Sequence, residues 1–205
     1  STFDDTGCPV SKGSSRSCFR LRFDTTSELR DAVDKYLFDD SPESEVASTY
    51  GFPISIWSVS KIQDFSYLFS SQSRESSERF NFAAGAFNED ISQWDVSNAT
   101  TMRSMFAGNQ NTGSRFNQPI GNWDVSSVTD MRIMFCGAVG FDQPIGNWDV
   151  SSVTDMSSMF QLTESFNQPI GNWNVSSVAD MSFMFALAAS FNQTLADWNV
   201  QSNTD

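Results

Sequence analysis

The sequence predicts an α/β repeat fold: a solenoid with a parallel sheet on one side, short helical turns on the other and an N-terminal capping helix. Three observations predict it. One phrase recurs at a fixed interval along most of the chain. Each copy joins an apolar spacing suited to a strand with one suited to a helical turn. The additional residues between early copies fall at a single point of the repeat, as expected for loops on one side of a stack.

The recurring phrase is QPIGNWDVSSVTDM at residues 118–131, and it returns unchanged at residues 143–156. A third copy at residues 168–181 differs only at Asn174 and Ala179. Intervals of twenty-five residues separate the last four tryptophans, and longer intervals precede them. The tryptophans that mark successive copies are Trp57, Trp94, Trp123, Trp148, Trp173 and Trp198. An enzyme needs its reactive residues once, so a phrase repeated in this way favours architecture or a repeated contact surface.

Within one copy, Trp123 and Val125 alternate along the chain, as the same face of a short strand requires. The apolar residues that follow, from Val128 to Phe135, have helical spacing, and Ser127 precedes them as a possible N-cap. No single copy can bury its Trp, Met and Phe side chains alone. Stacked copies would place these side chains in a shared core, and we interpret the Trp and Met columns as core rather than as a cofactor site.

Residues 25–49 form the predicted capping helix and its connector, in which Thr25 and Glu28 are spaced as a capping box. Such a helix would cover the first coil of the stack. The repeats occupy residues 50–205 as about six coils, the last of them incomplete. No capping helix follows the last coil, so we expect either a longer chain or a partner at that end. Residues 1–24 form an N-terminal extension, in which Cys8 and Cys18 are disulfide candidates if the protein is exported.

Composition excludes several classes of function. The formal net charge is -13, and no Lys or Arg follows Arg132, which disfavours nucleic acid and anionic membranes as partners. Histidine is absent, which removes the commonest general base and transition-metal ligand. No apolar run is long enough to span a bilayer. Cys136 follows a Met-Phe pair and is interpreted as a buried thiol.

The units WDVSSVTDMRIMF and FNQPIGNWDV resemble the repeats of BspA-like leucine-rich-repeat surface proteins, a family of bacteria, mycoplasmas and many microbial eukaryotes. The resemblance extends from Tyr50 to Val200. It implies a curved, leucine-rich-repeat-like solenoid in which Trp takes the strand position that ordinary repeats give to Leu. It also implies an exported protein at the cell surface with a role in adhesion or binding, and it implies no catalytic residues.

The candidate binding site is a column of polar residues that directly follow the tryptophans and would point outward from the strands. The members of this outer column are Asp95, Asp124, Asp149, Asn174 and Asn199. Neighbouring members would lie roughly 4.8 Å apart, so three carboxylates would repel one another unless cations or donors intervene. The column could bind a polar ligand such as a glycan, or calcium at Asp95, Asp124 and Asp149, and the alternative is a solvated polar face. We expect no other cofactor.

Two further columns are interpreted as structural. Stacked amides after each Phe can bond the adjacent backbone, and they are Asn88, Asn117, Asp142, Asn167 and Asn192. The column of Gly121, Gly146 and Gly171 would permit a tight backbone position. Among three glycosylation sequons, Asn98 is the favoured acceptor if the chain passes through a eukaryotic secretory route.

The sequence therefore predicts a non-catalytic, extracellular or surface-exposed repeat protein that binds a protein or glycan partner through its strand face or its loops. One alternative is a structural subunit of a larger assembly, packed through its open C-terminal coil. A weaker alternative is a carbohydrate hydrolase, for which the outer column offers no unique pair of carboxylates.

Overall fold

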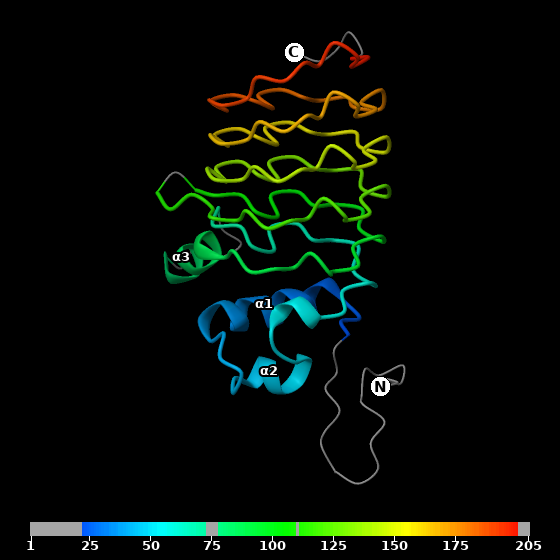
Figure 1. The fold of residues 1–205 in the computed structure, drawn as a ribbon. Coiled ribbons are helices and arrows are strands. Elements are labelled where there is room, and N and C mark those ends of the chain that lie inside the picture. The colour runs from blue at the N-terminus through cyan, green and yellow to red at the C-terminus, as the bar shows by residue number, and fades with distance from the viewer. Residues whose placement is uncertain (1–21, 73–77, 110, 201–205) are drawn as a thin grey trace.

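The computed structural model describes residues 22–72, 78–109 and 111–200, and within α3 the side chains of residues 78–80 are not described. In Figure 1 the repeats form a stack of coils that rises from a helical N-terminal end to the C-terminus. The elements in chain order are α1 (Thr26–Phe38), α2 (Glu45–Tyr50), the 3-10 helix η1 (Ile54–Ile56) and α3 (Glu78–Ala86). Cys8 and Cys18 lie outside the described residues, and the predicted division into three segments stays a prediction.

The predicted helix is present as α1 and begins at the predicted cap. The Thr25 side chain accepts a hydrogen bond from the backbone N–H of Glu28 at 3.2 Å. The Glu28 carboxylate returns a contact to the backbone N–H of Asp24, one residue earlier than a capping box requires. The buried face of α1 is Leu29, Ala32, Val33 and Tyr36. Its Tyr36 ring meets Trp57 edge-on at 5.4 Å, so α1 packs on the first coil.

The predicted parallel sheet is wrong, and with it the leucine-rich-repeat-like solenoid. Among residues 22–72, 78–109 and 111–200 no strand is formed, and the parallel pairing that exists is a series of isolated bridges. The Trp-Asp-Val segment does not extend as a ladder, because its backbone folds into turns. Trp123 N–H donates to the Ile120 carbonyl, and Val128 N–H donates to the Val125 carbonyl. These bonds within a coil leave no row of groups to pair with the next coil.

The predicted helical turns after Val128 are also absent, and this segment carries the bonds between coils instead. Met134 N–H donates to the Met131 carbonyl, and Ile133 between them has a φ of 62°. A positive φ at the third residue of a bonded four-residue turn is the type II geometry. Ser104, Ser158 and Phe183 repeat it in other coils. Turns of this kind, rather than a helix, keep one apolar residue in three pointing inward.

Neighbouring coils are joined by hydrogen bonds from alternate residues of this segment. Met131, Ile133, Phe135 and Gly137 donate their N–H groups to carbonyls of the following coil at 2.8–3.0 Å, and those carbonyls belong to Asp155, Ser157, Met159 and Gln161. The same four positions donate in the coils before and after it. Along this segment, each coil therefore presents backbone donors toward the C-terminal end of the stack and carbonyls toward the N-terminal end.

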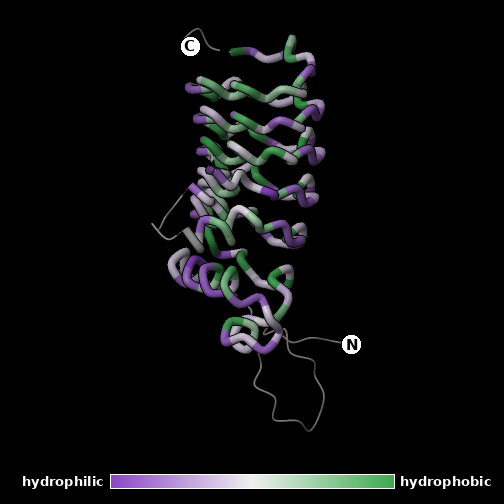
Figure 2. Tube along the Cα trace, turned by 90° about the vertical axis from the view of Figure 1, so that its left-hand side faces the viewer, coloured by the Kyte–Doolittle hydropathy of each residue, from purple (hydrophilic) through white to green (hydrophobic). Residues whose placement is uncertain are grey.

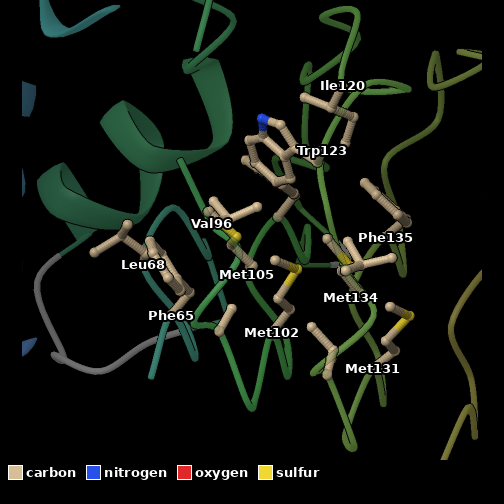
Figure 3. Packing of buried hydrophobic residues seen from close by; sticks show 14 of the residues in the cluster. Phe65, Leu68, Val96, Met102, Met105, Ile120, Trp123, Met131, Met134 and Phe135 are labelled. Carbon is tan, nitrogen blue, oxygen red and sulfur yellow. The ribbon is translucent and has the colours of Figure 1, made fainter. Parts of the chain in front are cut away.

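The core prediction is confirmed: Trp, Met and Phe side chains of successive coils fill a common interior. Figure 3 shows Met102, Met105, Met131 and Met134 of two adjacent coils in that interior, and all four are fully buried. Phenylalanines stack within a coil, as Phe135 and Phe141 do at 4.0 Å, and between coils, as Phe135 and Phe160 do at 5.7 Å. In Figure 2 the hydrophilic residues gather at the outer bends of the coils.

The indole N–H groups bind each coil to the one before it. Trp148 Nε1 donates to the Ile120 carbonyl at 3.1 Å, and Trp173 Nε1 donates to the Ile145 carbonyl at 3.2 Å. Trp94, Trp123 and Trp198 make the equivalent bond. A buried carbonyl at the turn thereby gains a partner that leucine could not supply. Trp at this position thus combines a large buried surface with a bond between coils.

Candidate functional site

The outer column lies on the surface of the stack, as predicted, and all five of its members are exposed. Its side chains nevertheless have a structural role that the sequence interpretation missed. Asp124 Oδ1 accepts hydrogen bonds from the backbone N–H of Ser126 at 3.1 Å and from its hydroxyl at 2.6 Å. Asp95, Asp149 and Asn174 each accept the backbone N–H of the serine two residues later. These four members thus each close an Asx-turn at a bend of their coil.

Hydrogen bonds from serines favour the ionised form of two of these carboxylates, Asp124 and Asp149. The side-chain and backbone bonds from Ser126 lower the pKa of Asp124 below its ordinary value, and those from Ser151 do the same for Asp149. The negative charge of Asp149 in the neighbouring coil raises the pKa of Asp124, but this effect is smaller than that of the serine bonds. At neutral pH the column therefore holds negative charges at its Asp members, and Asn174 and Asn199 are neutral.

Replacing Ser126 by alanine is expected to raise the pKa of Asp124 toward 3.8, because the largest cause of its lowered value is the bond from the serine side chain. An Asp with a lowered pKa stabilises the fold above its unfolded value and loses that contribution as pH falls through the folded value. The loss therefore falls below about pH 4. NMR titration of the Asp124 carboxyl carbon measures this pKa in the wild type and in the variant. Equal pKa values in the two proteins would contradict the hydrogen bond from Ser126.

Calcium at Asp95, Asp124 and Asp149 gains no support from the geometry. Within the part of the chain that the structure describes, no group of three or more Cys, Asp or Glu side chains is close enough to hold a metal ion. Each carboxylate also spends one oxygen on its own serine. The single outward oxygen that remains on each residue is better suited to a hydrogen-bond donor or a cationic group than to an enclosed ion.

The column that begins with Asn88 and continues through Asn117, Asp142, Asn167 and Asn192, called the Asn88 column, bonds one coil to the next. This confirms its structural interpretation. Asn117 Oδ1 accepts the backbone N–H of Asp142 at 3.0 Å and the amide of Gln143 at 2.8 Å. Asp142 and Asn167 repeat this bond toward the next coil. The column leaves little for a ligand, because its oxygens already hold the backbone and a Gln side chain of the following coil.

Replacing Asn117 by alanine is expected to lower the free energy of unfolding by about 1–3 kcal/mol, because the Asp142 N–H and the Gln143 amide lose their acceptor. Asn117→Asp keeps the accepting oxygen and is expected to cost less, as Asp142 fills the same position in the next coil. Urea unfolding of both variants measures the difference. Equal losses would show that the bonds contribute nothing specific.

A second acidic column was not predicted as a column. Its members lie where coils pair through isolated bridges, and they are Asp64, Asp130, Asp155 and Asp180, with Thr101 in the second coil. Asp130 Oδ1 accepts the N–H of Arg132 at 2.9 Å, and Asp155 Oδ1 accepts that of Ser157. The signal in the sequence was an Asp directly before Met131, Met156 and Met181.

The remaining predicted residues also have defined places. Cys136 is a buried free thiol, as predicted, and burial raises its pKa. It lies in the wall of an open groove of about 720 Å³ beside Gln72, Gln161 and Glu164. Asn98 is exposed, and its side-chain amide donates to the Ser60 carbonyl at 2.8 Å. Its glycosylation stays a prediction.

The comparisons with known proteins give one match. The model of a family described as "Mycoplasma protein of unknown function, DUF285" matches residues 45–113 and 108–205. No curated protein and no solved structure matches the chain. In the described ranges no helix is both long and apolar enough to cross a membrane.

Proposed function

We propose that this chain, which belongs to the family described as Mycoplasma protein of unknown function, DUF285, is a BspA-like surface repeat protein that binds another macromolecule without catalysing a reaction. The proposed place of binding is the outer column. The proposed location is the outer surface of a cell or the extracellular medium. The family match covers the repeats, and it supports a repeat protein of this group rather than any particular ligand.

The observation that carries the proposal is a contrast between columns. The Asn88 column and the Trp Nε1 column are committed to bonds between coils. The outer column bonds only within its own turns, is exposed in all five coils that carry it, and holds lowered carboxyl pKa values at Asp124 and Asp149. Outward oxygens repeated once in each coil suit an extended partner with regularly spaced donors or positive charges.

We propose a basic protein segment or an amino sugar polymer as the chemistry that such a column would recognise. Binding of oligolysine and of glucosamine oligomers, with N-acetylated oligomers as the neutral comparison, tests this by calorimetry at low salt. The variant Asp95→Asn, Asp124→Asn, Asp149→Asn keeps each turn acceptor and removes three charges. It is expected to weaken binding at least tenfold, about 1.4 kcal/mol.

The matched control removes three exposed charges elsewhere, through Asp31→Asn, Asp40→Asn and Glu43→Gln near α1. It is expected to bind almost as the wild type does. Equal weakening by both triple variants would mean that binding follows net charge alone and would count against a site at the outer column. A wild-type protein that binds none of the probes would count against this partner chemistry. Release of reducing sugar from the oligomers would instead support the weaker alternative, a carbohydrate hydrolase.

A second candidate function, a structural subunit, is favoured by the last described coil. Phe183 and Leu187 are each 71% exposed. Phe185, Phe191 and Trp198 are only partly buried, whereas the counterparts of these three one coil earlier are buried, namely Phe160, Phe166 and Trp173. The N–H groups of Phe183, Phe185 and Leu187 have no acceptor within residues 22–72, 78–109 and 111–200. The equivalent groups of the preceding coil all donate to the next one.

This edge is directional, which restricts what could pack against it. The carbonyls of Met181, Phe183 and Phe185 are already bonded within turns, so the edge offers backbone donors. Two copies meeting end to end would oppose donors to donors. A partner would need a row of carbonyls, as another coil of this type has. Light scattering with Phe183→Asp and Leu187→Asp, against Phe82→Asp on α3 as control, tests the alternative, and a dilution-resistant wild-type monomer without a co-purifying chain would contradict it.

A further inference from the structure

Two arginines in neighbouring coils carry guanidinium groups that no described residue neutralises. Arg103 and Arg132 occupy the same position of the repeat, two residues after Thr101 and Asp130. Their coils are paired directly beside them, because Ser104 N–H donates to the Arg132 carbonyl at 2.9 Å. Paired backbones of this kind lie roughly 4.8 Å apart. Two like charges are thus held one coil apart in a chain whose net charge is -13.

The surroundings of the two guanidinium groups are incomplete. Both side chains are partly buried, and the Nε atom of each, like that of Arg30, is buried without a hydrogen-bond partner. Arg103 lies over the Tyr67 ring, with its guanidinium carbon 5.7 Å from the ring centre. Neither side chain makes a hydrogen bond or an ion pair with any residue of the described ranges. A single arginine commonly packs its aliphatic chain against the protein and keeps its guanidinium group in water. Two arginines in adjacent coils additionally repel each other through their positive charges.

The coil below shows what a neutralised arginine looks like on the same side. Arg30 of α1 donates from Nη2 to Asp64 Oδ2 at 3.0 Å, and to the carbonyl and hydroxyl of Ser66. The acidic column that begins with Asp64 has Thr101 in the coil of Arg103. Asp130 is present in the coil of Arg132, but its Oδ1 accepts the Arg132 backbone N–H. The Arg132 charge makes a minor contribution to the lowered pKa of Asp180.

We propose that Arg103 and Arg132 together form a binding site for a single oxyanion of a partner molecule: a carboxylate, sulfate or phosphate group. A guanidinium offers a planar fork of N–H donors that fits such oxygens in pairs, and two forks one coil apart can grip one anion from two sides. The anion supplies the negative charge that Thr101 does not. This site stands apart from the outer column, which has the opposite charge, so either can fail without the other.

The test is an NMR titration of the whole chain that follows the Nε–Hε signals of its arginines. Sodium sulfate, phosphate and acetate are added separately, each against sodium chloride at equal ionic strength. The Arg103 and Arg132 signals are expected to shift together and to saturate with sulfate or phosphate, and the order of the three affinities identifies the preferred group. Shifts that match those in chloride would overturn the proposal.

Variants make the test specific. Thr101→Asp puts a carboxylate beside Arg103, and its Oδ1 can accept the Arg103 N–H as Thr101 Oγ1 now does. This variant and Arg132→Gln are each expected to weaken anion binding at least tenfold. Arg115→Gln removes an exposed arginine elsewhere and is expected to leave binding unchanged. Equal affinity in wild type, Thr101→Asp and Arg132→Gln would show that the arginines do not bind the anion, and circular dichroism confirms that each variant is folded.

Discussion

Replacing Trp148 by leucine is expected to lower the free energy of unfolding by about 3–5 kcal/mol. Trp148 is 4% exposed, and its ring lies 6.5 Å from Trp173 and 6.3 Å from Phe135. The smaller side chain leaves a cavity between coils, which relaxes only in part. It also removes one of the two donors to the Ile120 carbonyl, the Nε1 group at 3.1 Å, while the Trp123 N–H remains, and one lost hydrogen bond costs about 0.5–1.5 kcal/mol.

Urea unfolding followed by circular dichroism measures this loss, and Trp198→Leu is the matched comparison. Trp198 makes the same bond to the Ile170 carbonyl but is only partly buried, so its replacement is expected to cost less. Trp148→Phe separates the two contributions, because it keeps an aromatic ring and removes the donor. A loss below about 1 kcal/mol for Trp148→Leu would mean that the indole bond and ring stack carry little of the stability.

The buried residues were predictable because apolar residues recur at a fixed interval. The backbone conformation of the repeat was not predictable in the same way. Val125 and Val128, like Met131 and Met134, are three residues apart, and this spacing suits a helix and a chain of bonded turns equally well. The turns require a positive φ at Ile133 and Ser158. Neither residue is glycine, so nothing in the sequence indicates a positive φ at these positions. A helix was therefore the natural prediction where the structure has turns.

The position of the candidate site on the surface was predicted, but the hydrogen bonds of its side chains were not. Alternation with Trp and Val correctly placed Asp124 outside. The serine two residues after each Asp was already a sign of an Asx-turn, but only the next serine, Ser127, was interpreted, as an N-cap. The Arg103–Arg132 pair was missed, although Arg103 lies as far after Trp94 as Arg132 lies after Trp123, so that alignment of the copies gives both the same position.

The second large effect is expected at the glycine column, where Gly146→Ala should lower the free energy of unfolding by at least about 3 kcal/mol. A methyl group at Gly146 would lie 2.3 Å from the Pro169 carbonyl oxygen of the next coil, which is far inside contact distance. Gly121 has the same relation to Pro144, at 2.3 Å. The atom in the way is backbone rather than a flexible side chain, so relief requires two coils to move apart.

Gly140→Ala is the control that separates this effect from a general cost of replacing glycine. No atom lies within 4 Å of a methyl group built at Gly140, which is exposed. That variant is expected to stay within about 1 kcal/mol of the wild type, and restriction of the unfolded chain would favour a small gain. If Gly146→Ala proves as mild as Gly140→Ala, coils 143–167 and 168–192 can separate at little cost, and the close approach at the proline carbonyl is not what fixes their spacing. A large loss at Gly146 alone would show that the spacing of the whole stack depends on the missing side chain.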